Sequence, residues 1–328
     1  MIDIFIYQSY DKTTIIRLNS LNKTKIIYYD HSCIFIWFYK KKYSVFNKTY
    51  SEYINSKFVI SLIPFQNDFL FKKWGIKSIL MNNFMTYEYY LIIPSNLYFK
   101  TILLVGRAND KYKRFELGLL AFEYIYQNIP ESKMIIISSL NETSFLSELE
   151  ENLNSNNIEN PGYVSELEQF YKNASLHIIP SISESFSMVL CETKIYGIPN
   201  ILLGLEYLSA SSGGTIIIYD DTPESLAKEA IKILKDTNYR KFLGEQARIN
   251  IQKFNNQKLL ERWTKLLLSI YNSKNYYQKM IKEDKKISKK SAINIIKNEV
   301  NLIRKREKKL LNMTFYDILN LSYLKNIK

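Results

Sequence analysis

The chain has 328 residues, of which 46% are hydrophobic and 23% charged, a composition that is typical of a globular protein and excludes a generally disordered chain. Its net charge of +13 is concentrated near the C-terminus, because residues 274–328 hold 15 lysines and arginines against 5 aspartates and glutamates. The two cysteines, Cys33 and Cys191, are too few for a disulfide framework or a structural zinc site, so a reducing compartment fits best.

The first half of the chain, residues 1–97, alternates short apolar segments with polar, helix-like ones. Such alternation predicts an α/β domain with a parallel sheet. Helices are expected at 45–55 and 69–74, and Gly75 is expected to turn the chain into the next strand. The expected strands are 2–7, 25–29, 58–63 and 79–81.

A second series of elements begins at residue 101. The apolar run 101–105 predicts a strand covered on both faces, and a periodic helix follows at 114–127 and ends before Pro130. The other expected strands are 134–138, 175–179, 200–203 and 215–219, and the other expected helices are 142–153, 165–173, 186–196 and one that starts at Thr222-Pro223. This pattern indicates a doubly wound α/β domain, which binds ligands where strands end and helices begin.

From residue 239 onward the pattern is helical. A helix is expected at 253–270, packed on the body of the protein through its apolar face. Basic amphipathic segments follow, the last of them at 314–324. The chain therefore divides into three predicted parts, 1–97, 98–272 and 273–328.

The loop after the first strand of the second series is basic. Arg107 stands at the end of that strand, and Lys111, Lys113 and Arg114 stand at the start of the next helix. Cations at a helix N-terminus oppose the macrodipole by about 0.3–1 kcal/mol each, whereas a bound phosphate would reverse the sign of the effect. The residues leave two interpretations open, a phosphate site or a solvated basic loop that Asp110 partly offsets.

A serine-rich loop leads into the helix that begins near Phe186. The first N–H groups of that helix favour an anion, and Glu184 and Glu192 could approach one ligand from different sides. A spacing of eight residues is weak evidence by itself, because four further glutamate pairs share it. These pairs are Glu123/Glu131, Glu142/Glu150, Glu151/Glu159 and Glu299/Glu307.

Three motifs carry a resemblance to a known family. The segment PSISESFSMVLCETKIYGIP, residues 180–199, resembles the Pro-Ser…Glu-x7-Glu…Gly-x-Pro signature of retaining GT-B glycosyltransferases of the group 1 or family 4 type. LLVGRANDKYKRF, residues 103–115, resembles the Gly-Arg…Lys loop of that family. GYVSELEQFYKNASLHIIPS, residues 162–181, resembles its Gly-x-Val…Tyr…Ala-Ser…Pro-Ser run. The three motifs stand in the family's order within residues 98–272.

The resemblance implies a GT-B-like α/β fold with two Rossmann-like domains, each with a parallel sheet. It implies a shortened acceptor-side domain at 1–97, a nucleotide-sugar donor-binding domain at 98–272 and a basic helical extension at 273–328. The implied reaction moves a hexose from a nucleotide-diphosphate sugar to an acceptor hydroxyl with retention of the anomeric configuration. The acceptor, whether glycan, lipid or protein, is left open. No Asp-x-Asp metal motif occurs, and neither a metal nor another cofactor is expected.

The resemblance also assigns roles to residues. In that family Arg107 and Lys113 would hold the donor diphosphate and Glu192 the ribose hydroxyls. The two catalytic candidates are Glu184, at the donor sugar, and His31, facing the acceptor. The other expected donor-binding residues are Gly106 in the phosphate loop, Gly162 and Tyr163 near the base, and Ser185, Phe186, Ser187, Met188 and Val189 at the helix start. Ser185 and Ser187 stand where the family often has glycine.

Both histidines also have a structural interpretation. His31 could be a capping or packing residue, and His177, within an apolar strand, is expected to be buried structure. A catalytically inert or partner-dependent nucleotide-sugar-binding protein stays open as the alternative function, because the first half of the chain is short for an acceptor domain.

The location and partners of the protein follow from charge and hydropathy. The longest apolar runs, such as 33–39, are far shorter than the roughly 20 residues of a membrane span, and residues 1–10 contain no basic leader. We therefore expect a cytoplasmic protein. Residues 274–328 could lie on an anionic membrane surface or form a solvated extension. Nucleic acid is not expected, because the aromatic residues are scattered and form no ladder for stacking bases.

Overall fold

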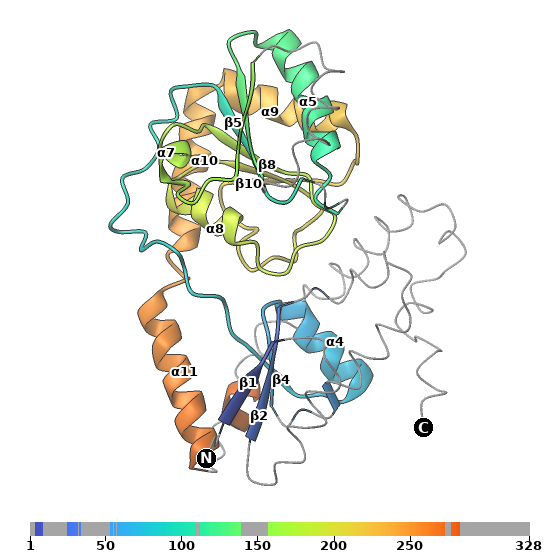
Figure 1. The fold of residues 1–328 in the computed structure, drawn as a ribbon, viewed down its shortest axis with the longest axis vertical. Coiled ribbons are helices and arrows are strands. Elements are labelled where there is room, and N and C mark those ends of the chain that lie inside the picture. The colour runs from blue at the N-terminus through green and yellow to red at the C-terminus, as the bar shows by residue number, and fades with distance from the viewer. Residues whose placement is uncertain are drawn as a thin grey trace, which may run out of the picture. The chain divides into compact units, whose positions relative to one another are not determined.

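The computed structural model describes residues 4–8, 25–31, 33, 53–54, 56, 58–108, 110, 112–138, 157–272 and 277–282. They belong to two compact units (Figure 1). The first unit comprises Met1–Asn83, Tyr207–Ser209 and Asn256–Lys328, and the second comprises Phe84–Glu206 and Ala210–Asn255. The expected helix at 142–153, most of the one at 45–55 and the basic segments beyond 282 lie outside the described residues.

The first unit contains a parallel sheet, as predicted. Its strands are β1 (Ile4–Tyr7), β2 (Lys25–Asp30), β3 (Phe58–Ser61) and β4 (Ser78–Leu80), paired in that order. Helix α4 (Pro64–Trp74) joins β3 to β4 and begins five residues before the predicted start. Proline suits the first helical turn, because its φ is already helical and no N–H is needed there. Gly75 ends the helix with a left-handed φ of 67°.

Helix α11 (Asn256–Tyr271) packs within the first unit. The ring of Trp263 lies edge-on to Tyr29 of β2 at 5.5 Å, and the Lys25 amine donates hydrogen bonds to the carbonyls of Ile270 and Tyr271. The boundaries of the two compact units do not coincide with those of the three parts expected from the sequence. Helix α11 lies in the first unit, and residues 84–97 lie in the second.

The second unit is a six-stranded parallel sheet in the doubly wound order. Its strands are β5 (Thr101–Val105), β6 (Lys133–Ile137), β7 (Ile158–Gly162), β8 (Leu176–Ile179), β9 (Asn200–Leu203) and β10 (Thr215–Ile218), and they lie in the order β10-β9-β8-β5-β6-β7. The strand order reverses between β5 and β8, which makes their carboxyl ends the switch point where such folds bind ligands.

Strand β7 was not predicted from the sequence. Its residues are Ile-Glu-Asn-Pro-Gly, and the last three are residue types that are typical of a turn. The strand lies at the edge of the sheet, beside β6 alone, and an edge strand tolerates a proline because one row of its N–H groups needs no partner in the sheet.

Helices cover both faces of this sheet. On one face α5 (Phe115–Asn128) and α9 (Pro223–Lys235) pack against each other and enclose the main hydrophobic cluster (Figure 1). Thr222 caps α9 as predicted, because its side chain accepts the N–H of Ser225. On the other face lie α8 (Met188–Ile195) and α10 (Thr237–Ile251), which contact each other, and the short α7 (Glu168–Lys172) precedes β8.

At one point the approach of α10 to the turn after α8 leaves no room for a side chain. A Cβ atom added to Gly244 of α10 would lie 2.4 Å from the carbonyl oxygen of Gly197, in the turn after α8. That separation is far below any real Cβ contact, so backbone meets backbone here. The same approach places α10 against the turn that follows α8.

Residues 84–97, which we call the strap, run over the surface of the second unit. The Arg248 guanidinium of α10 donates to the carbonyls of Tyr89 (2.9 Å) and Ile92 (3.2 Å) in the strap and of Ile195 (2.6 Å) at the end of α8. The Ser95 hydroxyl donates to the carbonyl of Ala174 over 2.6 Å. The strap is thereby fixed to the same elements that form the sheet's second helical face.

A further buried cation, Lys194 of α8, holds the loop before β10. Its amine donates to the carbonyls of Ser212 (2.6 Å) and Gly213 (2.7 Å), and burial lowers the pKa of Lys194 to about 7. None of the helices among the described residues combines the length and the apolar character needed to cross a bilayer.

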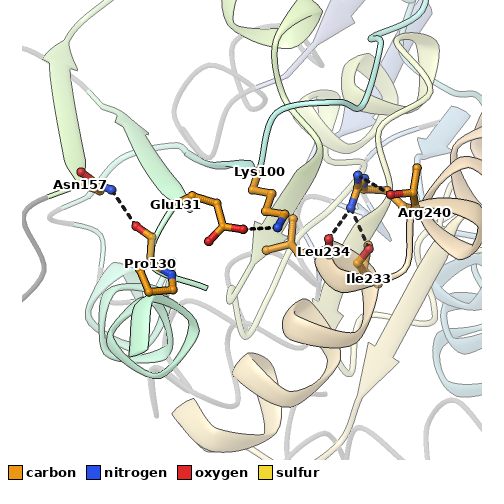
Figure 2. Close-up of polar contacts among 8 residues, drawn as sticks. Lys100, Pro130, Glu131, Asn157, Ile233, Leu234 and Arg240 are labelled. Carbon is orange, nitrogen blue, oxygen red and sulfur yellow. Dashed lines mark hydrogen bonds and ion pairs between the residues drawn. The ribbon is translucent and has the colours of Figure 1, made fainter. Parts of the chain in front are cut away.

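Among the residues that the structure describes, Arg240 is the largest fully buried side chain, and it joins the end of α9 to the end of the strap (Figure 2). It donates to the carbonyls of Ile233 (3.2 Å) and Leu234 (2.6 Å) in the last turn of α9, and to Leu97 (2.9 Å). Figure 2 also shows Lys100 paired with Glu131, and Asn157 donating to the carbonyl of Pro130.

We predict that Arg240→Met destabilises the protein by about 3 kcal/mol, because it leaves three buried carbonyls without their charged donor. Arg240→Lys should lie between Arg240→Met and the unmodified chain. Urea denaturation followed by circular dichroism measures the effect. Lys241→Met, at the exposed neighbour, is the matched control and should change the unfolding free energy by less than about 0.5 kcal/mol. Equal stability of the two methionine variants would contradict this role.

His177 of β8 is buried structure, as the sequence predicted. Its Nδ1 lies 2.8 Å from Oδ1 of Asn200, and Nε2 has no hydrogen-bond partner among the residues that the structure describes. Burial lowers the pKa of His177 to about 4. The unfolded chain therefore binds a proton near pH 6.5 that the folded chain does not accept until about pH 4.

Stability should consequently fall as the pH is lowered from 6.5 to 4, with His177 contributing a loss on the order of 3 kcal/mol over that window. Because the chain has only two histidines, NMR titration of imidazole signals can separate them, with His31→Asn providing the assignment. A His177 signal that titrates above pH 6 would overturn the prediction.

Candidate functional site

Two loops meet at the switch point between β5 and β8. Residues 106–114 follow β5 and residues 180–187 follow β8. The N–H of Ile182 donates to the carbonyl of Tyr112 over 2.9 Å, and the Lys113 amine lies 2.6 Å from Oε1 of Glu184. The structure thus brings together two of the motifs found in the sequence, through one backbone bond and one ion pair.

The first loop turns sharply after β5. Gly106 has a φ of 153°, a conformation that residues with a Cβ rarely adopt. The Arg107 guanidinium lies 2.9 Å from the carboxylate of Asp110, and its side chain is 69% exposed. The Lys113 N–H donates to the Asp110 carbonyl over 2.7 Å, which closes the loop. Arg107 is therefore exposed to solvent and paired with one carboxylate, whereas Lys113 is paired with Glu184 of the second loop.

The third basic residue, Arg114, has a structural role. It precedes α5 with a left-handed φ of 52°, and its guanidinium pairs with Asp221 at 2.5 Å and with Glu116 at 3.2 Å. These carboxylates satisfy the cation within the fold. Lys111 lies outside the described residues.

The Lys113–Glu184 pair is shielded from water. The side chains are 21% and 11% exposed, so the attraction between amine and carboxylate is screened less than in a surface pair. The pair joins the two loops beside the backbone hydrogen bond of Ile182 with Tyr112, so it adds a second contact between them. An amine and a carboxylate consequently lie side by side at the carboxyl ends of β5 and β8.

The second loop is anchored by Phe186. This side chain is 1% exposed and lies edge-on to Phe254 at 5.6 Å, so it belongs to the core while its backbone remains at the helix start. Ser187 precedes α8 with a φ of 60° and makes no side-chain cap to the first turn. Met188 and Val189, in that first turn, are partly buried. The N–H groups of this turn are thus left for backbone, solvent or ligand acceptors.

Glu192 lies one turn further along α8 and is 8% exposed. Its Oε1 accepts the Thr86 hydroxyl over 2.6 Å, and its Oε2 accepts the Tyr171 hydroxyl over 2.7 Å. Burial and the negative charge of Glu192 raise the pKa of Tyr171 well above its ordinary value, which keeps this hydroxyl a donor. The sequence motifs contained Tyr171 without a role for it, and no sequence signal pointed to Thr86.

Gly162 and Tyr163 lie at the carboxyl end of β7, two strands from β5. Gly162 has a φ of 72°, and its carbonyl accepts the N–H of Ser138 at the end of β6. Tyr163 is 58% exposed. Both residues lie on the same side of the domain as the two loops, because all strands of a parallel sheet have their carboxyl ends on one side.

His31 belongs to the first unit, directly after β2. Its ring centroid lies 4.2 Å from that of Tyr29, and partial burial lowers the pKa of His31 below its ordinary value. The imidazole is thus mainly neutral at pH 7. Among the described residues no three His, Cys, Asp or Glu side chains gather as a metal-binding group.

The family model of "Glycosyl transferases group 1" matches residues 93–250. That range contains both loops, α8 and the whole six-stranded sheet. Residues 93–250 are a group 1 glycosyl transferase domain. The group 1 domain carries every predicted donor-site residue, and the ion pair of Lys113 with Glu184 lies within it.

Curated relatives resemble the same region. An uncharacterized glycosyltransferase of Haemophilus influenzae is 21% identical over 173 residues, which cover 51% of this chain and 49% of the relative. An uncharacterized glycosyltransferase of Methanocaldococcus jannaschii is 26% identical over 164 residues, which cover 46% of this chain and 40% of the relative. The chain thus spans half or less of the length of these relatives.

Solved structures extend the likeness beyond the group 1 domain. Sucrose-phosphate synthase of Thermosynechococcus elongatus has a TM-score of 0.68 at 17% identity, covering 83% of this chain and 74% of that one. Staphylococcus aureus TarM, in a complex that contains UDP, has a TM-score of 0.67 at 16% identity over 81% and 55% of the chains. Anabaena HepE with UDP has a TM-score of 0.66 at 15% identity over 81% and 79%. These likenesses confirm the predicted GT-B-like fold, with a parallel sheet in each of two regions.

Two of the four serines in the second loop, Ser185 and Ser187, should respond in opposite directions to replacement by glycine. Ser187 has a left-handed φ, whereas Ser185 does not. Ser187→Gly should relieve about 1 kcal/mol of strain relative to Ser187→Ala, while Ser185→Gly should destabilise by about 0.5–1 kcal/mol relative to Ser185→Ala. Thermal unfolding of the four variants measures both differences. Equal signs at the two positions would contradict the backbone assignment.

Proposed function

We propose that the protein is a retaining glycosyltransferase that moves a hexose from a nucleotide-diphosphate sugar to an acceptor hydroxyl without a metal ion. The observation that carries the proposal is the ion pair of Lys113 with Glu184 beside the start of α8, at the switch point of a group 1 domain. Cations and helix N–H groups suit a diphosphate, and carboxylates suit sugar hydroxyls.

The diphosphate would lie between the first loop and the start of α8. Arg107 is paired with Asp110 at the surface, where an ion pair stabilises by about 1 kcal/mol or less, so exchange of this partner for a phosphate costs little. Lys113 already faces the second loop. Bond breaking between the anomeric carbon and the diphosphate oxygen places negative charge on the leaving group, and both cations would stabilise that charge.

The two glutamates would bind hydroxyls of the donor. A carboxylate has about four acceptor sites, and in Glu192 each oxygen accepts one protein hydroxyl, which leaves acceptor capacity for the two ribose hydroxyls. Glu184 would accept hydroxyls of the sugar while its other contact, Lys113, remains at the phosphates. His31, neutral at pH 7, is the proposed residue on the acceptor side.

Uridine diphosphate is the first nucleotide to test, because the TarM and HepE complexes contain UDP. The acceptor class remains open between glycan, lipid and protein. The curated relatives are about twice as long as the matched region, so the activity of the whole protein is part of the proposal.

The test is a thermal-shift titration with UDP, GDP, ADP, CDP and TDP, followed by donor hydrolysis and transfer assays with the matching sugars. We expect one nucleotide to raise the melting temperature, since a ligand stabilises the state that it binds. Arg107→Ala and Lys113→Ala should each weaken its binding at least tenfold, because each removes a charged contact of about 1.5–3 kcal/mol.

Lys133→Ala is the matched control, because Lys133 is also ion-paired, with Glu159, but lies at the amino end of β6. It should bind the nucleotide like the unmodified chain. Absence of binding to all five nucleotides would contradict the proposal. Binding without hydrolysis or transfer would instead favour the partner-dependent or inert nucleotide-sugar-binding protein.

A further inference from the structure

The Glu192 carboxylate is held by two hydroxyls of different character. Tyr171 is fully buried, and its hydroxyl reaches Oε2 from the core. Thr86 is exposed to solvent, and its hydroxyl reaches Oε1 from the strap over 2.6 Å. One oxygen is therefore held by a buried hydroxyl, and the other is held by a hydroxyl of a solvent-exposed residue.

The strap holds Thr86 firmly at this place. The adjacent Tyr87 packs edge-on against Tyr196 at 5.6 Å, directly after α8. Arg248 binds the carbonyl of Tyr89 over 2.9 Å, three residues beyond Thr86. The strap is thus held directly after Thr86, by a ring contact at the end of α8 and by a charged donor from α10. Thr86 precedes the residues 93–250 that the family model matches.

The orientation of a carboxylate determines which hydroxyls it can accept. The two ribose hydroxyls are adjacent, so they need the free lone pairs of both oxygens to point in one direction. With only Tyr171 in place, a single hydrogen bond would oppose rotation of the carboxylate about its last bond. The Thr86 bond to the other oxygen restricts that rotation further.

We propose that Thr86 is a positioning residue for Glu192, and that it sets the preference of the site for ribonucleotides over 2′-deoxyribonucleotides. This inference rests on the proposed function, because it requires that Glu192 binds the ribose. Thr86 acts through the carboxylate and need not touch the nucleotide. Its removal should therefore weaken the contact to the ribose diol more than contacts to base or phosphate.

The experiment compares Thr86→Val, which keeps the shape and loses the hydroxyl, with Thr86→Ser, which keeps the hydroxyl. Calorimetric affinities are measured for UDP, ADP and GDP, each beside its 2′-deoxy counterpart. Thr86→Val should weaken binding of the preferred ribonucleotide about tenfold and that of its deoxy counterpart less than about twofold, because one oriented hydrogen bond is lost. Thr86→Ser should keep the ratio of ribonucleotide to deoxyribonucleotide affinity of the unmodified chain. A merely structural role of Thr86 would leave that ratio unchanged in Thr86→Val as well.

Thr215→Val is the matched control. Thr215 lies on β10, and its hydroxyl has no hydrogen-bond partner among the residues described, so the same exchange removes no contact there. This variant should keep both affinities. Thermal unfolding of Thr86→Val verifies that the variant is folded before its affinities are compared.

The outcomes separate the inference from the proposed function. If the unmodified chain binds none of the diphosphates, or if Glu192→Gln keeps the full ribonucleotide preference, both the proposed ribose contact and this inference are wrong. If Glu192→Gln abolishes the preference and Thr86→Val retains it, the inference alone is wrong. Tighter binding of the ribonucleotide by Thr86→Val would also overturn it, because Thr86 would then compete with the ligand.

Discussion

The site depends on the pairing of β5 with β8. These strands are far apart in sequence, and their pairing at Ile102–Leu176 and Leu103–His177 brings the loops that follow them to one edge of the sheet. The backbone hydrogen bond from Ile182 to Tyr112 then holds one loop against the other. Lys113 and Glu184 can approach to 2.6 Å because of this arrangement, and α8 begins four residues after Glu184. The chemistry is therefore a result of topology more than of any single loop.

Around this centre, buried cations serve as clamps for the backbone. Arg240, Arg248 and Lys194 donate mainly to carbonyl oxygens, at helix ends and irregular segments whose acceptors the helices and sheet leave unsatisfied. A guanidinium has five donors in a rigid fork, so one arginine can serve several carbonyls at once. Part of the positive charge in this basic chain is thereby used inside the second unit, where it connects the strap, α8, α9 and α10.

The sequence predicted the parallel sheets and nearly all described elements, because apolar runs such as 101–105 and 200–203 coincide with strands. It missed β7, whose Asn-Pro-Gly end reads as a turn. The motifs also predicted which loops would meet, as the contact of Lys113 with Glu184 shows. The partners of Glu192 could not be predicted in the same way. Thr86 lies 106 residues away from it in an irregular strap, and no periodicity or spacing identifies a contact that only tertiary packing creates.

The contact of Gly244 with Gly197 illustrates a wider property of this chain. It has nine glycines in 328 residues, well under half of the roughly 7% usual in proteins, while isoleucine, lysine and asparagine are abundant. Seven of the nine have a positive φ, and the other two would place a Cβ within 3.1 Å of a neighbour. Glycine thus stands in this chain where a positive φ or a close approach excludes a side chain. The nine glycines therefore mark the points at which the backbone restricts the choice of residue, whatever the chemistry of the site.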